Sequence, residues 1–176
     1  MENASKALIM AATVLLGVMI ISVGVALFNS LSEFGRDTLK KTEEKRIAEW
    51  NNNFFKYYGC TITENDNEAK PIKVTAHDIV SLANFAKQSN ENYELTVASS
   101  GNKSTYYVQV MVKGISDNFE TLSDNEKNVF LKEQSLTEQT DVNGNIITQP
   151  KYFKCSEQPT ISEKTKRVMC IKFEPY

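Results

Sequence analysis

The chain has few of the side chains on which catalysis and metal binding usually depend. Its 176 residues include one histidine, His77, and three cysteines, Cys60, Cys155 and Cys170. One histidine cannot form a histidine-rich metal site, and the cysteines lack the C-x-x-C spacing of closed zinc sites. His77 falls in the first turn of a predicted helix, where a surface histidine is the common case. We therefore expect no metal site and no histidine-dependent catalysis.

The short motifs of common enzyme sites are also missing. There is no glycine-rich phosphate loop, no nucleophile elbow and no H-E-x-x-H helix. Residues 141–145 (DVNGN) match part of a calcium loop but lack its sixth-position glycine and closing glutamate, which favours a turn. A net charge of −2, from 20 basic and 22 acidic residues, excludes a strongly basic nucleic-acid-binding domain. We expect no catalytic residues, no cofactor and no small-molecule substrate.

Charge is absent altogether from one long stretch near the N-terminus. Residues 7–28 (ALIMAATVLLGVMIISVGVALF) are 22 consecutive uncharged positions. A helix of this length rises roughly 33 Å, which matches the hydrocarbon core of a bilayer. A cleaved signal peptide has a shorter apolar core, a more basic start and a small-residue cleavage site, whereas residues 29–33 (NSLSE) follow this run. The sequence therefore predicts a retained transmembrane helix over residues 1–28.

Small residues recur along this predicted anchor at spacings of four and seven positions, which places pairs of them near one face of a helix. Such residues let transmembrane helices approach closely, although they are also common in helices that do not associate. An acidic and a basic residue precede them, four apart and in the order favoured for a helical ion pair. We expect the anchors to associate through Glu2, Lys6, Ala7, Ala11, Gly17, Ser22, Gly24 and Ala26.

A helical pattern continues beyond the anchor, because residues 29–58 contain no proline. Residues 40–46 (KKTEEKR) are typical of a solvated helix surface, and a strong apolar face follows. Gly59 is well placed to end the helix. We predict a helical stalk or spine over residues 29–59. Its apolar face should pack on the sheet of a head domain through Ile47, Trp50, Phe54, Tyr57 and Tyr58.

Two capping boxes predict helices in the head domain, residues 60–176. One runs from Thr75 to Asp78 and the other from Ser123 to Glu126, with the second helix ending near Gln134.

Strand patterns lie between and after these helices. Residues 94–98 and 105–113 are rich in β-branched and aromatic side chains and predict a hairpin. Residues 151–155 and 168–173 predict a second pair of strands, and the Asn-Gly of 141–145 predicts a turn between two further short strands. The combination predicts an α+β domain with an antiparallel sheet packed on helices.

The cysteines and the charges give opposite indications about the side of the membrane. Cys155 and Cys170 flank a 14-residue loop between predicted strands, and a disulfide there would stabilise the fold by about 3 kcal/mol outside the cytoplasm. Cys60 would remain free or replace one of them. In contrast, five basic residues follow the anchor, and the positive-inside rule favours a cytoplasmic head. These basic residues are Arg36, Lys40, Lys41, Lys45 and Arg46, whereas only Lys6 and the amino group precede the anchor. The disulfide argument nevertheless leads us to expect the head outside the cytoplasm.

An apolar N-terminal helix that continues as the spine of an α+β head with a C-terminal disulfide loop resembles the plan of type IV pilins and pseudopilins. In that family the apolar helices bundle into a filament core, and an acidic residue near the mature N-terminus helps to set the register of subunits. Glu2 is the nearest candidate here, with Lys6 as its partner. The family's prepilin-peptidase signature, a glycine followed by phenylalanine and a glutamate five residues into the mature chain, is not matched. The resemblance implies a homo-oligomeric surface filament, and the alternative is a solitary anchored binding module of an envelope or secretion complex.

Overall fold

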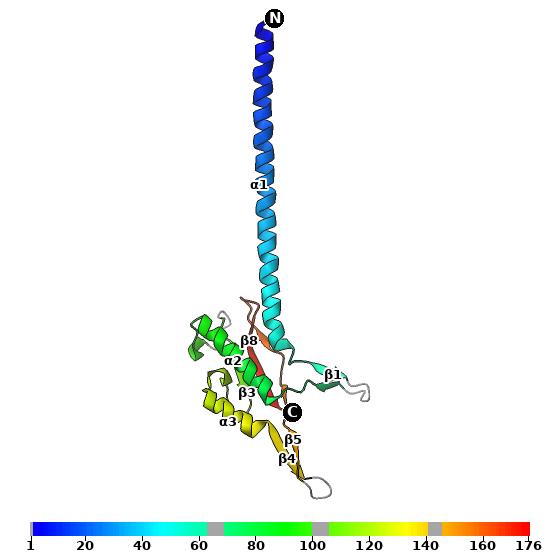
Figure 1. The fold of residues 1–176 in the computed structure, drawn as a ribbon, viewed down its shortest axis with the longest axis vertical. Helices are drawn as coiled ribbons and strands as arrows, with labels where there is room; N and C mark the ends of the chain where they lie inside the picture. The colour runs from blue at the N-terminus through cyan, green and yellow to red at the C-terminus, as the bar shows by residue number, and fades with distance from the viewer. Residues whose placement is uncertain (1, 63–68, 100–105, 141–145) are drawn as a thin grey trace. The chain divides into compact units, whose positions relative to one another are not determined.

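The computed structural model describes residues 2–62, 69–99, 106–140 and 146–176 (Figure 1). The chain divides into two compact units, residues 1–46 and 47–176. The division between them therefore falls within the predicted spine, rather than after residue 59.

The first unit consists of most of α1 (Glu2–Phe55), an unbroken helix of 54 residues. The large apolar side chains between residues 8 and 28 are 56–74% exposed. An exposed helical stretch that is apolar on all sides is typical of segments covered by lipid or by other helices. Of the helices in the described residues, only α1 is long and apolar enough to span a membrane, and it is compatible with an anchor.

The second unit begins with the last turns of α1, which end at Phe55 rather than at Gly59. Gly59 lies in the turn that follows, at a φ of +130°, a backbone conformation that favours glycine. Two helices follow in this unit, α2 (Ala76–Asn92) and α3 (Asp124–Gln134). Both predicted capping boxes are confirmed: Thr75 with Asp78 caps α2, and Ser123 with Glu126 caps α3.

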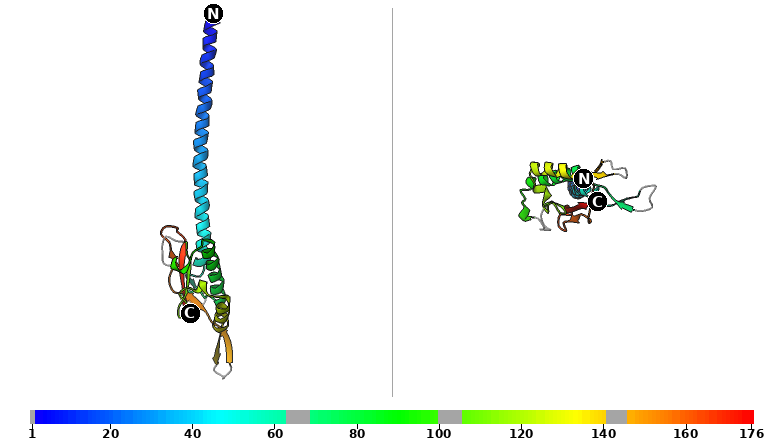
Figure 2. Two further views of the ribbon diagram at one scale, coloured as in Figure 1. Left: turned by 90° about the vertical axis from the view of Figure 1, so that its left-hand side faces the viewer. Right: turned by 90° about the horizontal axis from the view of Figure 1, so that it is seen from below.

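Four strands form the main sheet, which the two helices cover on one side (Figure 2). Its order is β3-β8-β6, with β7 also paired to β8. β6 and β7 run antiparallel to β8, whereas β3 runs parallel to it. The strands are β3 (Gln109–Val112), β6 (Phe153–Cys155), β7 (Thr160–Ile161) and β8 (Val168–Pro175).

Two antiparallel hairpins form separate two-stranded sheets. One pairs β1 (Cys60–Ile62) with β2 (Ala69–Pro71), and the other pairs β4 (Leu136–Thr140) with β5 (Ile146–Pro150). The described part of this unit also contains two short 3-10 turns, η1 (Val97–Ser99) and η2 (Phe119–Thr121).

The core lies between the sheet and the helices. Alternate residues of β3 and β8 face it, as the two-residue period of a strand requires, and the apolar face of α2 packs against them. The buried apolar set includes Phe54, Ile79, Ala83, Val110, Val112, Phe119, Phe153, Ile171 and Phe173.

The α+β class is confirmed, as is the pairing of residues 151–155 with 168–173 through β6 and β8. The hairpin predicted from residues 94–98 and 105–113 is wrong. Residues 97–99 form η1, and β3 pairs in parallel with β8, so the sheet is mixed rather than antiparallel. The alternating pattern in 105–113 specifies a strand but not its partner. The turn predicted at 141–145 lies outside the described residues, and the flanking strands pair as expected.

Candidate functional site

The predicted assembly residues lie along the exposed surface of α1. The Lys6 Nζ and Glu2 Oε1 atoms are 3.0 Å apart, and both side chains are largely in solvent, so the pair contributes little to stability. The Ser22 hydroxyl donates to the Val18 carbonyl oxygen at 2.8 Å and needs no partner outside its own helix. The smaller members are open to solvent, Gly17 only partly so; these are Ala7, Ala11, Gly17, Gly24 and Ala26.

Gly17 and Gly24 carry the most specific information in this set. A Cβ atom built on either glycine would meet nothing within 4 Å. The two glycines are therefore not required by packing within the chain. They leave room at the helix surface for another backbone to approach.

The predicted contacts of the spine with the head lie within the second unit. Phe54 is fully buried in the core, and Trp50 and Tyr57 pack against it at the edge. Ile47 is half-buried, whereas Tyr58 is 40% exposed. Tyr58 differs because α1 ends at Phe55, which turns this residue off the helical face.

Arg167 stacks on three aromatic rings beside the last turns of α1. Its guanidinium carbon lies 3.8 Å from the centre of the Trp50 ring, 5.5 Å from that of Tyr93 and 5.2 Å from that of Tyr106. Its Nη1 donates to the Tyr93 hydroxyl at 3.1 Å. Guanidinium groups stack favourably on aromatic faces, so this cluster joins the helix, the end of α2 and the β7–β8 turn.

Asn51 also joins α1 to the β7–β8 turn, because its side chain forms two hydrogen bonds with the backbone of that turn. Its amide nitrogen donates to the Lys166 carbonyl oxygen, and its amide oxygen accepts from the Val168 N–H, both at 2.8 Å. Sequence reasoning missed Asn51 and Arg167, because the contacts join positions more than a hundred residues apart.

Replacement of Arg167 by alanine should lower the free energy of unfolding by about 1–2 kcal/mol, because the stacked cation is lost. Arg167→Lys keeps the charge but not the planar group, and should recover only part of this. Urea unfolding followed by Trp50 fluorescence measures both. Wild-type stability in the alanine variant would show that the stacking contributes nothing.

The outer edge of β3 is closed by groups from neighbouring segments. The Asn90 side chain accepts from the Val108 N–H and donates to its carbonyl oxygen, both at 2.8 Å. The Glu120 carboxylate accepts from the Val110 N–H, and the Ser116 carbonyl accepts from the Val112 N–H, also at 2.8 Å. Each N–H that points away from β8 is therefore paired, so this strand cannot accept another strand.

Glu120 is the centre of a buried polar network. Its side chain is 1% exposed, and its carboxylate accepts from the Tyr107 hydroxyl at 2.7 Å. Lys127, also buried, donates to the Asn84 side-chain oxygen at 2.8 Å. Burial raises the pKa of Glu120 and lowers that of Lys127; burial, followed by Glu120, raises the pKa of Tyr107.

The network residues line neither of the two grooves described below, and within the described residues no three His, Cys, Asp or Glu side chains are grouped to hold a metal ion. His77 lies exposed on the first turn of α2. The Glu120 network therefore serves to join β3, η2 and α3.

The disulfide expected between Cys155 and Cys170 is not formed, and all three thiols, which lie in the described residues, are free. The reason is the register of β6 on β8. Cys155 lies opposite Phe173, so the two share the core face of the sheet. Cys170 is three positions from Phe173 on β8, so its side chain points to the opposite face.

The three thiols should react at different rates. Cys60 is exposed, whereas burial raises the pKa of Cys155 and of Cys170 to about 11. At pH 8 only about one in a thousand of the Cys155 and Cys170 side chains is therefore in the thiolate form, which is the reactive form. Timed maleimide labelling with peptide mass mapping should show Cys60 modified first and the other two only on unfolding. Equal rates at all three would contradict this assignment.

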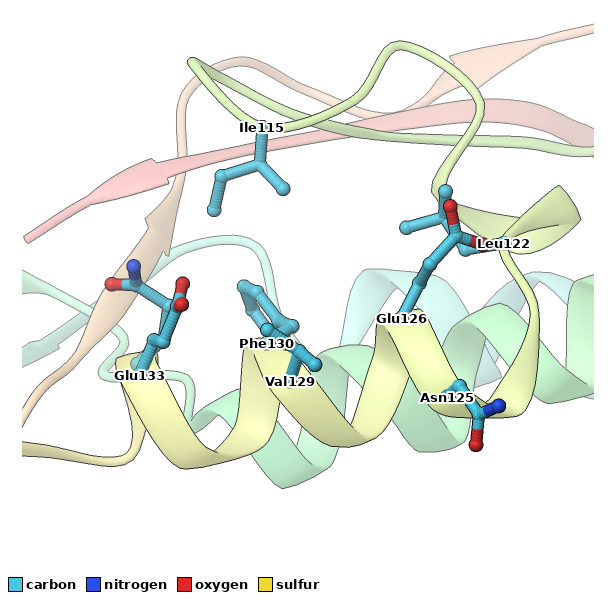
Figure 3. A pocket seen from close by; sticks show the side chains of 8 residues that line it. Ile115, Leu122, Asn125, Glu126, Val129, Phe130 and Glu133 are labelled. Carbon is cyan, nitrogen blue, oxygen red and sulfur yellow. The ribbon is translucent and has the colours of Figure 1, made fainter.

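An apolar groove lies between α3 and the loop that follows β3 (Figure 3). Its volume is about 350 Å³, and its apolar lining comes from Ile115, Leu122, Val129 and Phe130. Glu126 and Glu133 lie at its rim. A second groove of about 280 Å³ lies at the base of the β4–β5 hairpin. Both are suited to apolar side chains of a partner, and neither gathers a set of groups for catalysis.

No protein-family model, curated protein or solved structure matches this chain.

Proposed function

We propose that this chain is a membrane-anchored, pilin-like structural subunit of a surface filament, assembled through its N-terminal helix. The observation that carries the proposal is the uncovered apolar surface of α1 with the open positions at Gly17 and Gly24. A solitary anchor needs apolar side chains but has no need of small residues at helical spacings. Close helix packing uses both.

The ends of α1 fit the same role. The Lys6–Glu2 pair lies beside the apolar stretch, exposed and weakly held, so Glu2 can exchange its partner for a group of another copy. At the other end of the helix, Phe54 is anchored in the core of the α+β unit. In a pilin-like subunit the N-terminal part of one helix serves for assembly and the C-terminal part of the same helix packs in the head.

A filament requires the head to lie outside the cytoplasm, and the proposal includes this orientation. The cysteines no longer support it, since Cys155 and Cys170 are not bonded. The basic residues after the anchor favour the opposite side, so the orientation rests on the family plan alone.

The exposed thiol of Cys60 provides the test of orientation. In intact cells a membrane-impermeant maleimide should label wild-type chain and leave Cys60→Ser unlabelled. Labelling only after lysis would place the head in the cytoplasm and exclude the filament.

Electron microscopy of purified surface filaments, with antibody against the head, tests assembly directly. The proposal expects labelled filaments that disappear when the chain is deleted. A chain absent from every filament and monodisperse as a monomer in detergent would overturn it.

The second candidate is a solitary anchored binding module, and the groove beside α3 is the observation that favours it. An open apolar groove on a head can take a side chain of a partner protein. Photo-crosslinking from Val129, which lines the groove, separates the two candidates. Capture of one different protein supports the module, whereas capture of the chain itself supports the filament.

A further inference from the structure

The outer edges of β3 and β6 in the main sheet are closed by neighbouring segments, whereas the described residues place no partner on the outer edge of β5. The edge of β3 is closed by Asn90, Glu120 and Ser116. The outer edge of β6 is bridged by Val74, which exchanges two backbone hydrogen bonds of 2.8 Å with Phe153. Among the described residues, by contrast, β5 pairs with β4 alone.

β5 also lacks the usual devices that discourage edge pairing. Its sequence, IITQP, has no charge, and its proline is the last residue of the strand. Ile146 is 70% exposed. In comparison, β2 carries the charged Lys70 at its centre, a residue type that blunts an edge. An uncharged, β-prone edge is a template for another strand.

The hairpin gains most from such a partner because it forms a sheet of two strands only (Figure 1). Two-stranded hairpins are marginal in water, and a third or fourth strand adds backbone hydrogen bonds and cross-strand contacts. The outward N–H and C=O groups of β5 provide the pairing surface.

We propose that β5 pairs edge to edge with β5 of a second copy, forming one sheet of order β4-β5-β5-β4 between two heads. The inference rests on the proposed function, since it supplies a contact between subunits of the assembly. A two-fold axis makes identical strands pair antiparallel.

Charge decides which strand takes this position. β5 brings no charge against its own counterpart, whereas pairing through β4 would bring the central Glu138 of one copy close to that of the other. Like charges facing each other across strands are unfavourable. The occupant of the β5 edge is therefore the uncharged strand of a second copy.

Two matched cysteine variants test the pairing in full-length chain in membranes, each in a Cys60→Ser background. Thr148 and Glu138 lie opposite each other within the hairpin. In the proposed sheet, the Thr148 positions of two copies are about 5 Å apart and the Glu138 positions about 15 Å apart, from the spacing of strands. Under mild oxidation Thr148→Cys should give at least tenfold more crosslinked dimer than Glu138→Cys.

A third variant, Thr13→Cys on the glycine face of the anchor, separates failure of this inference from failure of the proposed function. Dimer from Glu138→Cys instead of Thr148→Cys overturns the pairing through β5, as does a crosslink to a different protein. If only Thr13→Cys crosslinks, the anchors associate and the hairpin inference is wrong. If none crosslinks, the assembly itself is wrong. Adding Ile146→Lys to Thr148→Cys should abolish the dimer by placing charge on the edge.

Discussion

Replacement of Glu120 by alanine should lower the free energy of unfolding of the head by about 3 kcal/mol. The variant removes the acceptor of the Val110 N–H and the charged acceptor of the Tyr107 hydroxyl, and a lost hydrogen bond to a buried group costs about 1–3 kcal/mol. It also removes a negative charge close to the buried Lys127. Trp50, the only tryptophan, reports unfolding of the head because its ring packs on Phe54 and Phe85.

Glu120→Gln is the matched control. The amide oxygen can accept from the Val110 N–H, and the amide N–H can donate to the Tyr107 oxygen, so the shape and both contacts are kept. We expect a loss of about 1 kcal/mol or less near neutral pH, since hydrogen bonds between neutral groups are weaker than those to a carboxylate. An equal loss in both variants would show that the charge, rather than the hydrogen bonding, stabilises the network.

Wild type and Glu120→Gln should also differ in how their free energy of unfolding depends on pH. Burial raises the pKa of Glu120 above its value in the unfolded chain, so the folded state disfavours the ionised form. The contribution of Glu120 is therefore complete below the unfolded pKa of about 4.3 and decreases as pH rises through the folded pKa. Glu120→Gln has no group that ionises at this position, so it does not lose this contribution. Its free energy of unfolding relative to wild type should therefore increase as pH rises. Urea unfolding from pH 4 upward measures the difference.

Local chemistry in the sequence predicted the local features of this fold. The capping boxes at Thr75 and Ser123 each satisfy helix N–H groups within four residues, so their signal is complete in the sequence. The same holds for the long apolar helix, because an uncharged run of 22 residues indicates by itself a helix long and apolar enough to span a membrane.

Pairing between distant segments could not be predicted in the same way. Nothing in the β3 sequence indicates that β8, rather than the preceding segment, is its partner, and the disulfide expectation depended on a register that places Cys155 opposite Phe173. Asn90 and Glu120 were missed for a related reason. A polar residue that closes a strand edge is recognisable only once the strand order is known.

Gly17 and Gly24 should determine whether the anchors associate. Leucine at both positions should lower crosslinking between copies at least tenfold, because the added side chains prevent the close approach of two backbones. Either leucine can be placed without a clash inside the chain, since a Cβ at each glycine meets nothing within 4 Å. Helix formation should not suffer, because leucine favours the helix more than glycine does. Thr13→Cys crosslinking in membranes, read against protein density, measures the change, because Thr13 is four residues from Gly17 and eleven from Gly24 and so lies on the same face of the helix.

Leucine at Val18 and Val25 provides the control, because it also places two leucines one heptad apart but rotates them by one residue around the helix. These variants should keep wild-type crosslinking. If both pairs weaken association equally, the contact is not specific to the glycine face. If the glycine variants crosslink like wild type, close helix packing does not hold the subunits together. Crosslinking through Thr148→Cys should persist more strongly than anchor crosslinking in the glycine variants, since the β5 edge and the anchor are independent contacts between copies.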